Sequence, residues 1–217
     1  MTEFQRARSD EAKRRREEAI LEAARTLGAR DGIRRVTLTD IAEAVGMHKS
    51  AMLRYFETRE QIFLLLTAAG WREWSSALRD DLDRRRTATA AGVGGAFART
   101  LSERGMFCDL LAQAPLNLER NVSVEAVRDF KLVTHAEVDA IVAAVRRLLP
   151  RLTEADGVDL IAAATALAGA MWQISTPGEE LAALYRSDPR LAHAVVELRP
   201  RLERLLTAQL EGVLAHR

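Results

Sequence analysis

Apolar residues recur every three to four positions along almost the whole chain, and no convincing stretch alternates apolar and polar residues. The three-to-four spacing places apolar side chains on one face of an α-helix, whereas a half-buried strand needs a period of two. The series Ile20, Ala23, Ala24 and Leu27 is a clear example. The sequence therefore predicts an all-α protein.

Glycine, proline and capping residues divide this pattern into separate helices. Gly32 ends a first helix over 10–30, and Thr37 caps a short second one that has Asp40 at its third position. A long helix begins at Thr58, where Thr-Arg-Glu-Gln fits a capping box. Prolines mark or flank many later boundaries. The other helices are expected at 48–54, 58–86, 95–104, 106–114, 121–149, 153–175, 179–186, 189–197 and 200–215.

Length and composition limit the classes of protein to consider. The chain has 217 residues, enough for a small domain fused to a larger one, and its hydrophobic (48%) and charged (29%) fractions are ordinary for a globular protein. The N-terminal segment is charged and has no apolar signal core, and no apolar run approaches the ~20 residues that span a bilayer. Cys108 is the only cysteine, which excludes an intrachain disulfide. We expect a cytoplasmic protein without a membrane partner.

The stretch from Val36 to Phe63 carries the strongest functional pattern. It predicts two short helices joined by a turn at Val45-Gly46-Met47, and Gly46 can take the left-handed geometry of such a turn. Ile41, Ala42, Val45 and Met52 fall where the two helices must touch. The second helix would then expose a polar, donor-rich surface of the width that enters a DNA major groove. The residues on this surface are His48, Lys49, Ser50, Arg54 and Tyr55.

This stretch resembles the DNA-binding signature of the tetracycline-repressor (TetR/AcrR) family. The residues in register are Thr37, Ile41, Ala42, Gly46, Lys49, Tyr55, Phe56 and Glu60. Three positions depart from the usual form: His48 replaces a small residue, Leu53 a tyrosine and Arg59 a lysine. The resemblance implies a three-helix helix-turn-helix head, residues 1–58. A long helix would join this head to a larger bundle for ligand binding and dimerisation, residues 59–217.

The resemblance also implies roles on a double-stranded DNA operator. The residues that would meet or clamp backbone phosphates are Thr37, Thr39, Arg54, Tyr55 and Arg59. Those that would face base edges are His48, Lys49 and Ser50. Two of these residues have a second interpretation, because Tyr55 is also suited to packing and His48 to capping without a base contact.

A basic run, Lys13–Arg16, stands out in a chain whose formal net charge is only +1. Two interpretations remain open. With Arg6 and Arg8, the run would lie along the DNA backbone or reach a minor groove. Alternatively, it is a solvated helix face that pairs with the glutamates following it.

Two segments are suited to self-association, since operators are usually read by two-fold dimers. Helix 153–175 is rich in Ala and Gly, and helix 200–215 carries an apolar stripe at helical spacing. Paired across a two-fold axis, they would form a homodimer, as the resemblance also implies. The expected interface residues are Ala164, Leu167, Leu202, Leu205, Leu206, Gln209 and Val213. The alternative is that both stripes face only their own core.

A small-molecule effector is the second expected partner. Effector pockets are mostly apolar with a few polar anchors, so the candidates are large or soft side chains of the central helices, with His135 as the polar anchor. These candidates are Trp71, Trp74, Met106, Phe107, Phe130, His135, Met171 and Trp172. The alternative is an ordinary core, where aromatic and methionine residues at helical spacing more often belong.

Motifs for catalysis or cofactor binding do not occur in the sequence. The four histidines form no metal-like spacing, and no HExxH, GxSxG or P-loop is present. Gly92–Phe97 falls short of GxGxxG and is expected only to lead into the next helix. We expect no enzyme, metal or cofactor. The prediction is a repressor that binds a palindromic operator as a dimer and is released by a largely apolar effector. An activator of the same architecture and a helical protein-interaction scaffold are the alternatives.

Overall fold

The computed structural model describes residues 3–194 and 196–216, with side chains placed for 10–191 and 196–216. Every regular element in these ranges is helical, which confirms the predicted all-α fold. The elements are α1 (Glu3–Asp31), α2 (Leu38–Ala44), α3 (Lys49–Met52), α4 (Arg59–Asp83), α5 (Ala90–Ser102), α6 (Gly105–Gln113), η1 (Leu118–Arg120), α7 (Val124–Leu148), α8 (Glu154–Ser175), α9 (Glu179–Ser187), η2 (Pro189–Ala194) and α10 (Leu198–Ala215).

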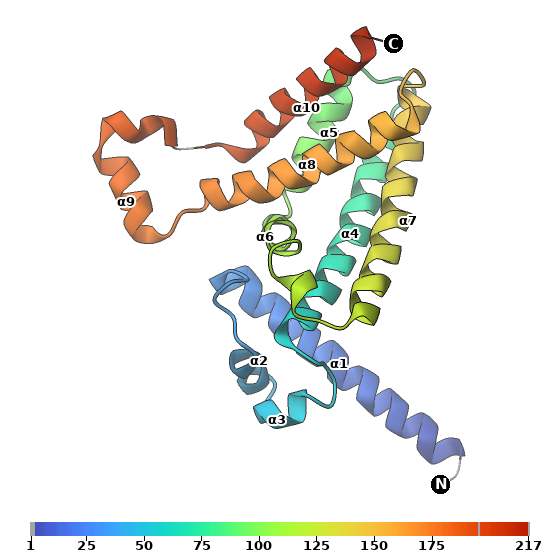
Figure 1. Cartoon of the computed structure of the whole chain (residues 1–217), viewed down its shortest axis with the longest axis vertical. Helices are drawn as coiled ribbons and strands as arrows, with labels where there is room; N and C mark the ends of the chain where they lie inside the picture. Colours follow the sequence, from blue (N-terminus) through green and yellow to red (C-terminus); the bar gives the residue numbers. More distant parts are fainter. Residues whose placement is uncertain (1–2, 195, 217) are drawn as a thin grey trace.

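The helices form a small head and a larger body (Figure 1). α1, α2 and α3 make up the head at the lower end of the view, and α4 runs from the head into the body. Within the body, α4 packs along α7, α10 packs against α5 and α8, and α8 also contacts α6. α9 and η2 project to one side, and α9 buries none of its own side chains.

Local capping interactions explain where the helices begin. At the start of α2, the Thr37 N–H donates to Asp40 at 2.7 Å and the Asp40 N–H donates to the Thr37 hydroxyl at 3.2 Å. At the start of α4, the Thr58 hydroxyl oxygen accepts the Gln61 N–H at 3.1 Å. Each bond satisfies an N–H group that has no partner within its own helix. Both threonines are the caps that the sequence predicts.

Among the boundaries that differ from the predicted ones are the starts of α5 and α10. The glycine-rich segment lies inside α5, where a Cβ atom at Gly94 would stand 2.7 Å from the hydroxyl oxygen and 3.0 Å from the backbone nitrogen of Thr207. The absence of side chains therefore lets α5 approach α10 closely. Pro200 lies in the first turn of α10, which begins at Leu198, because a proline is tolerated where no N–H partner is needed.

Asp81 ties the end of α4 to α5. Its side chain is buried and accepts hydrogen bonds from Arg84 at 2.9 Å, from Arg85 at 3.3 Å and from Arg99 of α5. Burial acts to raise the pKa of Asp81, but the charges of Arg99 and Arg85 and the hydrogen bonds outweigh it and leave the pKa below its ordinary value. The carboxylate is therefore a stabilising anion in the folded chain.

Replacing Asp81 by asparagine should destabilise the fold at neutral pH by about 1–2 kcal/mol. Because the folded-state pKa lies below the unfolded value of 3.8, the wild-type advantage is present above that pH and is lost as the pH falls through the folded pKa. Urea unfolding at about pH 7 and at about pH 3 measures the difference. The control is Asp83→Asn, whose exposed pair with Arg147 should contribute less. The stabilising role of the Asp81 carboxylate would be contradicted if both variants lost the same free energy of unfolding. It would also be contradicted if the difference between wild type and Asp81→Asn did not change with pH.

Candidate nucleic-acid interface and effector-binding residues

α2 and α3 form a compact two-helix unit around a left-handed turn. Gly46 has φ +64°, and its N–H donates to the carbonyl of Glu43 at 3.0 Å. Ile41, Ala42 and Met52 are buried between the helices, as the sequence predicts. The spacing of these residues thus fixes how α3 lies against α2.

The polar side chains of α3 point outward. His48 is its N-cap: Nδ1 accepts the Ser50 N–H at 3.4 Å and lies 2.9 Å from the Ser50 hydroxyl oxygen. His48, Lys49, Ser50 and Arg54 are all exposed, whereas Tyr55 is half-buried and packs against the core. α3 is shorter than predicted, and Arg54 and Tyr55 lie in the turn that follows it. Four of the five polar residues predicted for this surface are therefore open to solvent, and their contacts with DNA remain a prediction.

Two exposed threonines, Thr37 and Thr39, lie at the start of α2. The Thr37 hydroxyl is engaged with the Asp40 carboxylate at 2.8 Å as part of the cap. Hydrogen bonds from the backbone and side chain of Thr37 hold the pKa of Asp40 below its ordinary value. Asp40 therefore already provides a negative charge at the positive end of the α2 dipole.

Arg59 has a different place from the predicted phosphate clamp. It is half-buried, and it donates from Nε to the Val36 carbonyl and from a terminal nitrogen to the Ile33 carbonyl. It also pairs with Glu60 at 2.8 Å, and its guanidinium lies 4.8 Å from the centre of the Phe63 ring. The phosphate role is not supported, because the carbonyls of the α1–α2 turn lie within reach and take up these donors. Arg59 instead fastens the head to α4.

We expect Arg59→Ala to lower the free energy of unfolding by about 2 kcal/mol, since two carbonyls of the head lose their charged donor. Arg59→Lys should recover only part of this, because an ammonium lacks the planar fork of donors. Urea titration followed by circular dichroism measures both. The exposed Arg54→Ala serves as the control and should change stability by less than about 0.5 kcal/mol. If Arg59→Ala had the same urea midpoint of unfolding as the control, Arg59 would not stabilise the contact between the head and α4.

The basic run on α1 is exposed and partly paired within its own helix. Lys13 lies 3.8 Å from Glu17, and Arg15 lies 2.5 Å from Glu11, both four residues apart. Such pairs are typical of a solvated helix face. The side chains of Arg6 and Arg8 lie outside the described residues, so the two interpretations of the run remain open.

Three of the predicted effector residues belong to an aromatic cluster in the core. Trp71, Trp74 and Phe107 pack together with Phe97, with neighbouring ring centres 5.4–5.9 Å apart. Trp74 is 0% exposed, and its indole N–H donates to the Thr100 hydroxyl at 3.0 Å. These side chains follow the alternative interpretation of ordinary core packing.

The remaining predicted effector residues do not meet in one cavity. Met106 and Trp172 line a cleft of about 650 Å³ between head and body. Phe130 lines a separate pocket of about 200 Å³ beside α4. His135 is exposed on α7 and Met171 is buried. Met106 and Trp172 thus share the cleft, and Met106 also lines a smaller pocket of about 280 Å³ together with Phe107.

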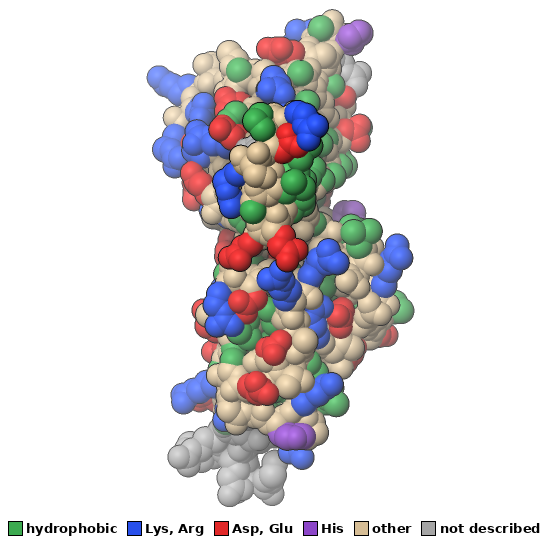
Figure 2. All heavy atoms as spheres, turned by 90° about the vertical axis from the view of Figure 1, so that its left-hand side faces the viewer, with side chains coloured by type: hydrophobic (Ala, Val, Ile, Leu, Met, Phe, Trp, Pro, Cys, Tyr) green, Lys and Arg blue, Asp and Glu red, His purple; other side chains and the backbone are tan. Residues whose placement is uncertain are grey.

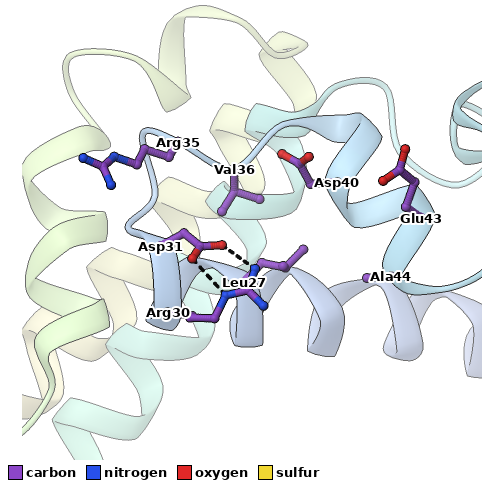
Figure 3. Close-up of a pocket in the computed structure, with 8 residues that line it drawn as sticks. All are labelled: Leu27, Arg30, Asp31, Arg35, Val36, Asp40, Glu43 and Ala44. Carbon is purple, nitrogen blue, oxygen red and sulfur yellow. Dashed lines mark hydrogen bonds and ion pairs between the residues drawn. The ribbon is translucent and has the colours of Figure 1, made fainter.

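A further hollow of about 440 Å³ lies on the head between α1 and α2 (Figure 3). Arg30 and Asp31 form a bidentate pair there, at 2.6 and 2.8 Å. Figure 3 shows the Arg35 side chain pointing away from the carboxylates of Asp40 and Glu43. With its charges paired or fully solvated, this hollow is not suited to an apolar effector.

Asp109 is a buried residue that sequence reasoning missed. One carboxylate oxygen accepts the backbone N–H of Ile33 in the head at 2.8 Å, and the other accepts from the Gln173 side chain of α8 at 2.8 Å. A single acid within the apolar segment of α6 was the available signal. Burial, with the nearby Asp109 charge, raises the pKa of Cys108 to about 12, so this thiol stays protonated. Asp109 therefore connects head, α6 and α8.

The predicted dimer residues fall into two groups. The structure corrects the prediction for Ala164, Leu202 and Leu206, which are 0% exposed and buried within their own chain. The physical reason is packing within the chain: Leu202 and Leu206 lie one turn apart on α10, which packs against α5 and α8, and Ala164 lies on α8, which packs against α6 and α10. The others are partly or well exposed: Leu167, Leu205, Gln209 and Val213.

Comparisons with known proteins agree with this architecture. The family model described as "Bacterial regulatory proteins, tetR family" matches residues 20–66, and "Tetracyclin repressor-like, C-terminal domain" matches residues 68–217. No protein of curated function matches the sequence closely enough to count as a relative.

Several solved structures share the fold at low sequence identity. A tetR-family regulatory protein from Rhodococcus RHA1 has a TM-score of 0.57 at 14% identity, with 91% of this chain and 96% of that chain covered. PfmR from Thermus thermophilus has a TM-score of 0.56 at 14% identity, with 88% and 97% covered. FadR from Bacillus subtilis, solved with stearoyl-CoA, has a TM-score of 0.53 at 13% identity, with 88% and 98% covered. Together with the family models, which span both head and body, these likenesses show that the chain belongs to the TetR family of DNA-binding transcriptional regulators.

Proposed function

We propose that the chain is a ligand-responsive repressor that binds a palindromic DNA operator as a homodimer and is released by a small effector. Residues 1–58 would serve as the DNA-binding head and residues 59–217 as the sensing and dimerising body, in the cytoplasm. The observation that carries the proposal is the outward projection of Lys49, Ser50 and Arg54 from a two-helix unit with its own core. A scaffold would not need this polar face.

The exposed residues suggest a division of roles on DNA. His48, Lys49 and Ser50 would face base edges, because they lie at the start of α3. Thr37, Thr39, Arg54 and Tyr55 would contact phosphates on either side. Arg59 has no place in this set, since its donors are used within the head.

Footprinting on the DNA upstream of the protein's own gene tests the proposal. We expect two protected half-sites about 34–36 Å apart along the duplex, and an affinity that falls steeply with salt. Reporter expression after deletion of the gene separates the two kinds of regulator, because loss of a repressor raises expression and loss of an activator lowers it. If the protein protected no segment of this DNA, the proposed binding to an operator there would be contradicted.

The dimer face that we propose runs along the outer sides of α8 and α10. An exposed stripe of small and apolar residues repeats every four positions on α8: Val158, Ala162, Ala166, Ala170 and Ile174. α8 is apolar enough by length and composition to cross a membrane, yet only 39% of its most apolar window is buried within the chain. α10 packs against α8, and its Leu205 and Gln209 are at least partly exposed, so we assign them to the same face. A second copy would cover it and explain why α8 is apolar on both sides.

Placing glutamate at Ala166 should convert the dimer to a monomer, because the two-fold axis would bring two buried carboxylates together. Sedimentation or size-exclusion chromatography measures the change. Ala143→Glu on the exposed side of α7 provides the matched control and should leave the dimer intact. If Ala166→Glu remained dimeric, the face would lie elsewhere.

The effector is expected to be small and largely apolar. FadR from Bacillus subtilis, which has the same fold, was solved with stearoyl-CoA, so this fold can hold a molecule with a long apolar chain. Binding would release the operator by favouring a conformer in which the two heads no longer match successive major grooves.

A further inference from the structure

We propose that the cleft between head and body binds an organic anion with a flat apolar part, and that the effector of the proposed function acts there. The inference rests on that function. The cleft has a volume of about 650 Å³ and lies between the α1–α2 turn, the start of α6, the end of α8 and the start of α9. This volume is in the range of small-molecule sites. Figure 2, which looks at this side, shows the molecule narrowed between its upper and lower parts.

One wall of the cleft is apolar and preformed. Met106, Trp172, Pro177 and Leu181 line it. The Trp172 ring lies directly against Gly105, because a Cβ atom added there would be 2.2 Å from the ring. Leu181 is 43% exposed on a helix that buries none of its side chains. A flat ligand would therefore find a fixed indole and an uncovered leucine to pack on.

The opposite wall carries positive charge that is left unpaired among the described residues. Arg30 is paired with Asp31, whose pKa is lowered by Arg30 and also by the nearby charge of Arg35. Asp109 accepts hydrogen bonds from two uncharged donors. Arg34 and Arg35 are exposed, and within the described part of the chain neither forms a hydrogen bond or ion pair through its side chain. Figure 3 shows Arg35 directed away from the acidic residues of α2. Three arginines and two aspartates line the cleft, so its lining carries one net positive charge, and the side chains of Arg34 and Arg35 still have hydrogen-bond donors to offer. Such donors beside an apolar wall favour a carboxylate or a phosphate ester.

A ligand in this cleft would contact both the head and the body. The Asp109–Ile33 hydrogen bond joins α6 to the α1–α2 turn, and Asp109 and Gln173 both line the cleft. Met106 also packs against α1, since a Cβ atom at Gly28 would lie 3.2 Å from its methyl group. A bound ligand therefore stabilises the conformer in which the distance between α6 and the α1–α2 turn fits it best. This preference for one conformer shifts the conformational equilibrium.

Three naphthalene derivatives that differ in one substituent test the proposal by calorimetry on the full-length protein. We expect 2-naphthoate or 2-naphthyl phosphate to bind at least about 10-fold more tightly than 2-naphthol, because only the anions can use Arg34 and Arg35. The anion that binds more tightly shows whether the cleft prefers a carboxylate or a phosphate ester. The Arg34→Gln/Arg35→Gln variant should remove this preference and leave binding of 2-naphthol unchanged.

Two further variants keep the outcome decisive. Arg120→Gln/Arg128→Gln makes the same charge change at exposed sites outside the cleft and should leave all three affinities unchanged. Leu181→Glu alters an exposed residue of the apolar wall and should abolish anion binding. Absence of binding by both anions at millimolar concentration, equal binding of 2-naphthol, or equal loss in the control pair would overturn the proposal. DNA binding without any probe is measured separately, so failure of the cleft leaves the operator proposal standing.

Discussion

Replacing Lys49 and Arg54 together by alanine should weaken operator binding about 100-fold. A lysine that reaches a guanine edge contributes about 1–3 kcal/mol of discrimination, and loss of a phosphate contact lowers the salt slope by about 1. Both side chains are exposed, so the free energy of unfolding of the variant should lie within about 0.5 kcal/mol of the wild-type value. Gel-shift titration at two or more salt concentrations measures affinity and slope together.

The matched control for this variant is Arg128→Ala/Arg151→Ala. It removes the same charge from exposed positions on the body, far from α3 in the sequence. If the body control weakened binding as much as the head variant, nonspecific attraction would explain the effect. The proposal that Lys49 recognises bases of the operator would then be wrong.

The largest loss of stability should follow Trp74→Ala, at about 4 kcal/mol. The side chain is 0% exposed and contacts three aromatic rings, so alanine leaves a cavity that the rigid helices cannot close. Thr100 remains satisfied in the variant because its hydroxyl also donates to the Ala96 carbonyl at 2.9 Å. The cost therefore comes mainly from lost packing.

Urea unfolding followed by circular dichroism provides the measurement, with two variants for comparison. Trp74→Phe should lose clearly less, since it keeps a ring in the cluster. Trp172→Ala should also lose less, because Trp172 is only partly buried at the cleft. A Trp74→Ala protein as stable as Trp172→Ala would show that the aromatic cluster does not hold the body together.

Much of the fold could be predicted because its boundaries are local. The caps at Thr37 and Thr58 bond to residues three positions away, and the turn at Gly46 depends on its own backbone angles. The exposed polar face of α3 could be located for the same reason, since the buried residues of α2 and α3 are fixed by spacing within one short segment. Which of its side chains contacts DNA remains a prediction.

The rest depended on contacts between distant segments. Leu202 and Leu205 belong to the same apolar stripe, and only the position of α5 buries the first and leaves the second 38% exposed. Arg59 finds its carbonyl partners 23 and 26 residues away, and Asp109 finds Ile33 at a separation of 76. No periodicity or motif within a single helix contains that information.

The continuity of α4 also has a mechanical consequence. Its 25 residues make a rod about 37 Å long, held to the head by Arg59 at one end and to the body by Trp74 and Asp81 further along. A rotation of about 5° about the far end would carry the near end through roughly 3 Å. Such a lever turns a small rearrangement among packed side chains into a displacement as long as a hydrogen bond.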